Sequence, residues 1–199
     1  GPWQVPVADA AVTIRGYAGF RGEAFAMGER SPVAVINPPA AARLAVAESL
    51  TNLISADVDS IDRVVLSANW MAAAGDNLEQ QGLFDSVYAV GEEFCPALGI
   101  AIPVGKDSLS MQTRWVDGQV TSPVTLIATA FAPVADVRQT VTPELVADQE
   151  TSLVLLHLTG ERLGGSALAQ VYSQMGSEAP DVDDPANFRE MLDFVLAAK

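Results

Sequence analysis

The pattern of apolar and polar residues predicts short strands that alternate with helices. Strand-like apolar runs lie at residues 3–14, 32–36, 63–70, 100–104, 110–116, 119–132 and 153–158. Helical spacing or composition is found at residues 40–54, 82–98 and 166–175, and in the final stretch after Pro185. Because strands and helices alternate along the chain, we expect an α/β (α+β) fold.

The longest predicted helix, residues 40–54, follows two prolines, which a first helical turn accepts without losing a hydrogen bond. Its polar side carries Ala41, Ala45, Glu48, Thr51, Asn52 and Ser55. Glu48 and Asn52 stand four residues apart, so their side chains project from neighbouring turns to one place. Two interpretations stay open: an ordinary partly exposed helix face, or a pair of oxygen ligands for Mg²⁺.

Several segments are predicted to be loops. Residues 15–30 contain four glycines, which favours a loop or an irregular hairpin, and Asp117-Gly118 is typical of a hairpin turn. Residues 135–150 are polar and predict a linker. The ~50 residues after it are too few for an independent core. We therefore expect one subdomain at residues 1–148 and the incomplete beginning of another at residues 149–199.

Composition narrows the functional classes. The chain has 199 residues, of which 49% are hydrophobic, and its net charge is −14. This charge argues against nonspecific nucleic-acid binding, which needs Lys and Arg to neutralise phosphates. No apolar run reaches the length of a membrane span, no signal peptide is visible, and a single cysteine suits the cytoplasm. Because the chain begins with Gly1, we expect it to be processed or cut from something longer.

Few residues suggest chemistry by themselves. Gly105-Lys106-Asp107-Ser108 follows a predicted strand, where a lysine and a carboxylate can contact phosphate and metal, although a structural turn is the competing interpretation. The motif is not a P-loop, because it lacks the earlier glycine and the following helix. Cys95 and His157 fall within a predicted helix and a predicted strand, so we expect both to be packing residues. Asp9 lies within an apolar run, where a carboxylate needs a sheet end or a partner.

Five long blocks resemble the single-chain form of phosphoribosylformylglycinamidine synthase (FGAR amidotransferase). They are GPWQVPVAD, GEAFAMGER, ARLAVAESLTN, VVLSANWMAAAG and AVGEEFCPALGIAIPVGKDSLSM. That family is a C–N ligase of purine biosynthesis that uses ATP, Mg²⁺ and glutamine as the amide-nitrogen donor. The resemblance is to the N-terminal subdomain of the second of two aminoimidazole-ribonucleotide-synthetase-like copies, running into its C-terminal subdomain. It implies a half-barrel sheet with flanking helices.

The resemblance also implies site residues. Asp9, Glu48 and Asn52 match Mg²⁺ ligands of an auxiliary nucleotide site, which holds ADP and is regarded as structural. Ala8 would contact the nucleotide there. Lys106, Asp107 and Ser108 match a family block, and we expect them to contact nucleotide as well.

Partners and alternatives follow from the same resemblance. It implies contact with the other synthetase half and with a glutaminase domain, whose Cys-His-Glu set this sequence lacks. We therefore expect no synthase or glutaminase activity from this chain alone, and self-association through the apolar face of the half-barrel. Two alternatives stay open: a purely structural half-barrel without nucleotide binding, and a stand-alone synthetase-like relative.

Overall fold

A mixed five-stranded sheet forms the base of the computed structural model, which describes residues 8–145, 150–158 and 160–199. In spatial order its strands are β1 (Ala11–Ile14), β2 (Gly22–Glu29), β7 (Thr125–Val134), β3 (Val65–Met71) and β4 (Ala101–Ser108). Only β3 and β4 are parallel. A separate hairpin pairs β5 (Gln112–Trp115) with β6 (Gly118–Thr121).

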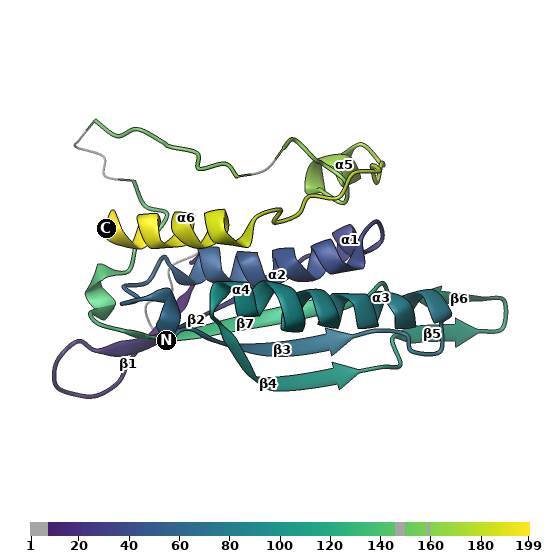
Figure 1. The fold of residues 1–199 in the computed structure, drawn as a ribbon, viewed down its shortest axis with the longest axis horizontal. Helices are drawn as coiled ribbons and strands as arrows, with labels where there is room; N and C mark the ends of the chain where they lie inside the picture. The colour runs from purple at the N-terminus through teal and green to yellow at the C-terminus, as the bar shows by residue number, and fades with distance from the viewer. Residues whose placement is uncertain (1–7, 146–149, 159) are drawn as a thin grey trace.

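The helices gather on one side of this sheet (Figure 1). They are α1 (Ser31–Ala34), α2 (Pro38–Leu53), α3 (Asn77–Tyr88), α4 (Cys95–Leu98), α5 (Ala167–Val171) and α6 (Pro185–Ala197). A π-helical segment, Ala89–Phe94, joins α3 to α4, and short 3₁₀ turns occupy Ile61–Arg63 and Val137–Gln139. In the described part of the chain no helix lies on the other side of the sheet, which we call the open face (Figure 1). None of these helices is long and apolar enough to cross a membrane.

The alternation of buried and exposed residues along β2 explains why the helices cover only one side of the sheet. Ala24, Ala26 and Gly28 are buried against the helices, whereas Phe25 and Met27 lie on the open face and are exposed. Small residues on the covered side let α2 lie close to the strand. Of the loop or irregular hairpin expected at residues 15–30, the hairpin is confirmed, because residues 15–21 connect the antiparallel strands β1 and β2. A loop is wrong beyond residue 21, because the glycines of β2 serve close packing rather than a bend.

Helix α2 confirms the helix predicted at residues 40–54. The side chain of Asn37 caps its first turn by accepting a hydrogen bond from the Ala40 N–H, at 3.1 Å. Ala41 and Ala45 of its predicted polar side are nevertheless buried, because Ala41 packs with Val33 and Ala34 of α1 and Ala45 lies against Gly28 of β2. Only the later part of that side remains accessible, and it includes Glu48 and Asn52.

Other predictions need correction. Residues 32–36 contain the end of α1 rather than a strand, because Pro32 fits the first turn of a helix. The predicted strand at 119–132 is two strands in different sheets, interrupted around Pro123. The hairpin itself is confirmed, with Val116 and Asp117 in the turn. The Gly105–Ser108 segment belongs to β4, so its interpretation as a turn is wrong.

The predicted helix at 82–98 is confirmed in extent, but its apolar stripe is not fully buried. Val87 is exposed, while Gly82 and Ser86 are buried instead. The π-helical segment has more residues per turn than an α-helix. It therefore shifts the buried face by about one position between α3 and Phe94.

The last part of the chain differs most from expectation. Residues 153–158 form no strand, and His157 is exposed, so its prediction as a core or sheet residue is wrong. An apolar run becomes a strand only beside another strand edge, and the described chain offers none there. Both predicted C-terminal helices are confirmed as α5 and α6.

Helix α6 is anchored on the helical layer that covers the sheet (Figure 1). Phe188 and Leu192 are buried in the main core, and the Phe188 ring stacks on Phe94 with 6.1 Å between ring centroids. Asp181, just before the helix, forms a two-pronged ion pair with Arg43 of α2, at 2.8 and 2.5 Å. Residues 181–199 thus share a core with residues before position 148.

Candidate functional site

The outer edge of β2 is only partly covered by β1. The pairing ends at Ala11 opposite Phe25, and beyond this point no strand of the described chain continues it. Side chains of α2 occupy the remaining edge. The Asn52 side-chain amide donates to the Met27 carbonyl at 3.0 Å, and Glu48 Oε2 accepts from the Glu29 N–H at 2.8 Å. The two residues that the sequence singled out therefore meet at the free end of β2.

The geometry leaves an oxygen of Asn52 available. A carbonyl can only accept a hydrogen bond, so the amide nitrogen of Asn52 must face Met27 and its Oδ1 faces away. An amide oxygen beside a carboxylate is a suitable donor set for a hard divalent cation. The described residues contain no group of three or more His, Cys, Asp and Glu side chains placed to hold a metal, so a site here needs the amide oxygen.

Glu48 has a second partner. Its Oε1 lies 2.9 Å from a guanidinium nitrogen of Arg30, and the two side chains are 26% and 50% exposed. Both residues line one hollow of about 490 Å³, together with Met27, Gly28, Glu29 and Ile127. Sequence reasoning missed Arg30, because only the turn after β2 brings it back beside α2.

Asp9 lies near the C-terminal end of α2, on the side of the helix that carries Glu48 and Asn52. It is exposed, follows Ala8, which is also exposed, and shares a hollow of about 390 Å³ with Thr51 and Ser55 of α2. Because β1 and β2 are antiparallel, the chain before Ala11 runs in the direction of Met27. The structure thus brings Glu48 and Asn52 together directly and places Asp9 in the adjoining hollow.

Lys106, Asp107 and Ser108 lie elsewhere, on β4 at the opposite edge of the sheet. Lys106 Nζ donates to Ser108 Oγ at 2.5 Å, so both side chains lie on one face, whereas the alternation of a strand places Asp107 on the other face. Three strand spacings of about 4.8 Å separate β4 from β2, or roughly 14 Å. These residues therefore form a group separate from Glu48 and Asn52.

Asn69 stands between the two groups and was not predicted. Strand register places it beside Lys106 on one side and Ile127 on the other, and Ile127 is in turn opposite Glu29. Its Oδ1 is buried and has no hydrogen-bond partner among the described residues. The alternation of Ser67 and Asn69 with apolar residues in β3 was the available signal in the sequence.

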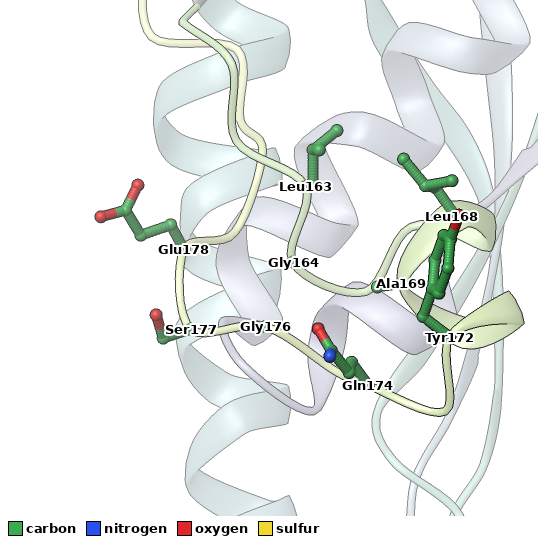
Figure 2. A pocket seen from close by; sticks show the side chains of 9 residues that line it. All are labelled: Leu163, Gly164, Leu168, Ala169, Tyr172, Gln174, Gly176, Ser177 and Glu178. Carbon is green, nitrogen blue, oxygen red and sulfur yellow. The ribbon is translucent and has the colours of Figure 1, made fainter.

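A further hollow, of about 320 Å³, surrounds α5 (Figure 2). Leu168 and Tyr172 lie side by side along it, and the opposite wall is the chain at Ser177 and Glu178 (Figure 2). Gly164 and Gly176 approach closely there, and the Gly164 N–H donates to the Glu178 carbonyl at 2.9 Å. No lysine or arginine lines this hollow, so it is poorly suited to phosphate.

Cys95 confirms its prediction as a packing residue. It is buried in the main core, and burial raises the pKa of its thiol to about 11. A thiol in this state is protonated at neutral pH and is not a nucleophile.

Solved structures share the fold of this α+β domain. The chain superimposes on PurLQS from Thermotoga maritima with a TM-score of 0.53 and 20% identity, covering 70% of this chain and 22% of that chain. The match to T. maritima PurL complexed with ATP has a TM-score of 0.53 and 19% identity, with the same coverage. The match to T. maritima PurL complexed with ADP has the same four values. The fold is thus that of one domain of these proteins, and the chain spans 22% of their length.

The sequence comparison then gives the family. The model of the FGAR-AT PurM_N-like domain matches residues 1–133, which is well over half of the chain. The chain belongs to this family. The family resemblance and the mixed α+β fold expected from the sequence are both confirmed.

Proposed function

We propose that this chain is part of a ligase that converts formylglycinamide ribonucleotide to formylglycinamidine ribonucleotide with ATP and glutamine. Within that enzyme it would serve as a nucleotide- and Mg²⁺-binding scaffold, without synthase or glutaminase activity of its own. Membership of the FGAR-AT PurM_N-like family supports the parent reaction. The observation that carries the local role is the meeting of Glu48 and Asn52 at the free end of β2.

The residues present fit a magnesium ion. Asp9, Glu48 and Asn52 would hold it through carboxylate and amide oxygens, which Mg²⁺ prefers. When bound, the ion would neutralise charge on the phosphate groups of ATP or ADP, and Ala8 would lie against the nucleotide. A net charge of −14 also attracts divalent cations to the chain.

The group on β4 would make a separate contact. Lys106 and Ser108 lie on the same face and together offer donors to a phosphate oxygen. Asp107 lies on the opposite face, so we propose that it contributes to a different part of the nucleotide site. Both roles are independent of the proposed ion at Glu48.

The open face fits a second sheet as its partner. Phe25 and Phe131 stack there with 5.9 Å between ring centroids, although both are about 40% exposed. Exposed apolar patches of this kind mark interaction surfaces. In the parent enzyme the other synthetase half would cover the face, and the glutaminase domain would bind elsewhere. In isolation a second copy of the chain would take that place.

The remaining expectations belong to the same proposal. Residues 149–199 would begin a second subdomain that packs on the first through α6, and the exposed apolar stretch at 153–158 would find a strand partner there. The single buried cysteine is compatible with a cytoplasmic enzyme.

A purely structural role is the second candidate, and one observation favours it. Glu48 and Asn52 already bond to the backbone of β2, so they could serve only to cover its free edge. Calorimetry with Mg·ADP separates the two functions. We expect binding heat for the wild type and none for Glu48→Gln, because glutamine keeps an acceptor for the Glu29 N–H but loses the charge.

Glu23→Gln is the matched control, because Glu23 lies on the far half of β2 and is exposed. It should bind Mg·ADP like the wild type. Absence of heat from the wild type, or equal heats from the wild type and Glu48→Gln, would favour the structural role. Formation of ADP from ATP in the presence of substrate and ammonia would contradict the proposed inactivity of the chain alone.

A further inference from the structure

Arg30 pairs with one carboxylate oxygen of Glu48 at the hollow beside β2. The guanidinium lies 2.9 Å from Oε1, while Oε2 is held by the Glu29 N–H. The ion pair of Arg30 is with Glu48, whereas Oε1 of the neighbouring Glu29 accepts hydrogen bonds from the backbone and hydroxyl of Ser31. Arg30 is therefore the cation that balances Glu48 in this structure.

A divalent cation and the Arg30 guanidinium would repel each other if both were bound to the Glu48 carboxylate. A metal bound to the carboxylate at about 2.1 Å would stand roughly 5 Å from the guanidinium, where like charges repel. The pair is weakly held, because half of the Arg30 side chain is exposed, and such surface pairs contribute little. We therefore expect the divalent cation to displace Arg30 from Glu48.

A released Arg30 would stay close to the site. It lies in the turn between β2 and α1, and it lines the same hollow as Glu48. Its planar guanidinium suits the phosphate oxygens of a nucleotide that arrives with the cation. We infer that Arg30 is an exchangeable counter-ion, an inference that rests on the proposed nucleotide and Mg²⁺ site. Arg30 neutralises Glu48 until a divalent cation binds, and it then binds the phosphate groups of the nucleotide.

The test compares Arg30→Met with Arg21→Met, which removes the same charge at the other end of β2. Titration with Mn²⁺ alone should show about three- to tenfold tighter binding by Arg30→Met than by the wild type, because a repelling charge is gone. Arg21→Met should stay within about twofold, because its charge lies more than a screening length away. At saturating Mn²⁺, ADP should bind Arg30→Met about tenfold more weakly, since a charged phosphate contact is lost.

The outcomes separate this inference from the function on which it rests. Equal or weaker Mn²⁺ binding by Arg30→Met relative to Arg21→Met overturns the exchange, and so does unchanged ADP affinity. Unchanged Mn²⁺ binding by Glu48→Gln shows instead that the proposed metal site is wrong, whatever Arg30 does. If neither the wild type nor Arg30→Met binds Mn²⁺, both proposals fail. Far-ultraviolet circular dichroism confirms that each variant is folded.

Discussion

Gly28 of β2 lies so close to Ala45 of α2 that a β-carbon added to the glycine would stand 2.1 Å from the Ala45 carbonyl oxygen. The same β-carbon would be 2.9 Å from the Glu48 β-carbon. This contact sets the distance between strand and helix. It is the reason that Glu48 and Asn52 can reach the backbone of β2.

Gly28→Ala should therefore push α2 away from the sheet. We expect a loss of about 1–3 kcal/mol in the free energy of unfolding, typical of overpacking in a tightly packed core. Gly75→Ala is the matched control, because an added β-carbon there meets nothing within 4 Å. Urea denaturation measures both variants, and similar stabilities for the two would contradict the close contact.

The sequence predicted α2 and the position of Glu48 and Asn52 on one side of it, because both depend on local properties. Helix propensity and first-turn prolines mark the helix, and four-residue spacing places Glu48 and Asn52 on one side. By contrast, β2 was not predicted. Its glycines resemble loop residues, and only the approach of α2 from elsewhere in the chain gives Gly28 its role.

Long-range register explains the site residues that were missed. Arg30 reaches Glu48 across 18 positions of sequence, and Asn69 meets Lys106 only because β3 and β4 pair in parallel. No local pattern encodes such contacts. The exposed run at residues 153–158 shows the converse, since strand propensity without a neighbouring edge does not produce a strand.

The ion pair between Asp181 and Arg43 should anchor the C-terminal helix. Its hydrogen bonds raise the pKa of the Arg43 guanidinium, and both side chains are largely buried. Asp181→Ala leaves the buried charge of Arg43 without this partner, so we expect the free energy of unfolding to fall by about 2–3 kcal/mol. Asp183→Ala breaks a more exposed pair with Arg162 and should cost less than about 1 kcal/mol. Equal losses of unfolding free energy for the two variants, measured by urea denaturation, would show that the Asp181–Arg43 pair does not anchor the helix.

The buried thiol of Cys95 predicts a dependence of stability on alkaline pH. Burial raises its pKa from 9.0 to about 11, so the native chain keeps a proton that the unfolded chain loses. The stability from this group is complete below pH 9 and is lost as the pH rises through about 11. Denaturation midpoints of the wild type should fall across this interval more steeply than those of Cys95→Ala. Parallel curves would contradict the raised pKa.

The open face predicts self-association. At about 10 µM, where a standard-size interface often holds, light scattering should give a mass above that of one chain. Phe131→Asp places a charge in the centre of this face and should yield a monomer. Phe84→Asp, on the exposed side of α3, should leave the association unchanged. A monomeric wild type would contradict the proposed self-association through the open face.

The most direct test of the nucleotide and Mg²⁺ site is anomalous diffraction from crystals grown with Mn²⁺ and ADP. The proposed site predicts a metal peak within about 2.1–2.5 Å of both Asn52 Oδ1 and a Glu48 carboxylate oxygen. A crystal with ADP bound, no metal peak at these oxygens and the Arg30–Glu48 pair intact would contradict it.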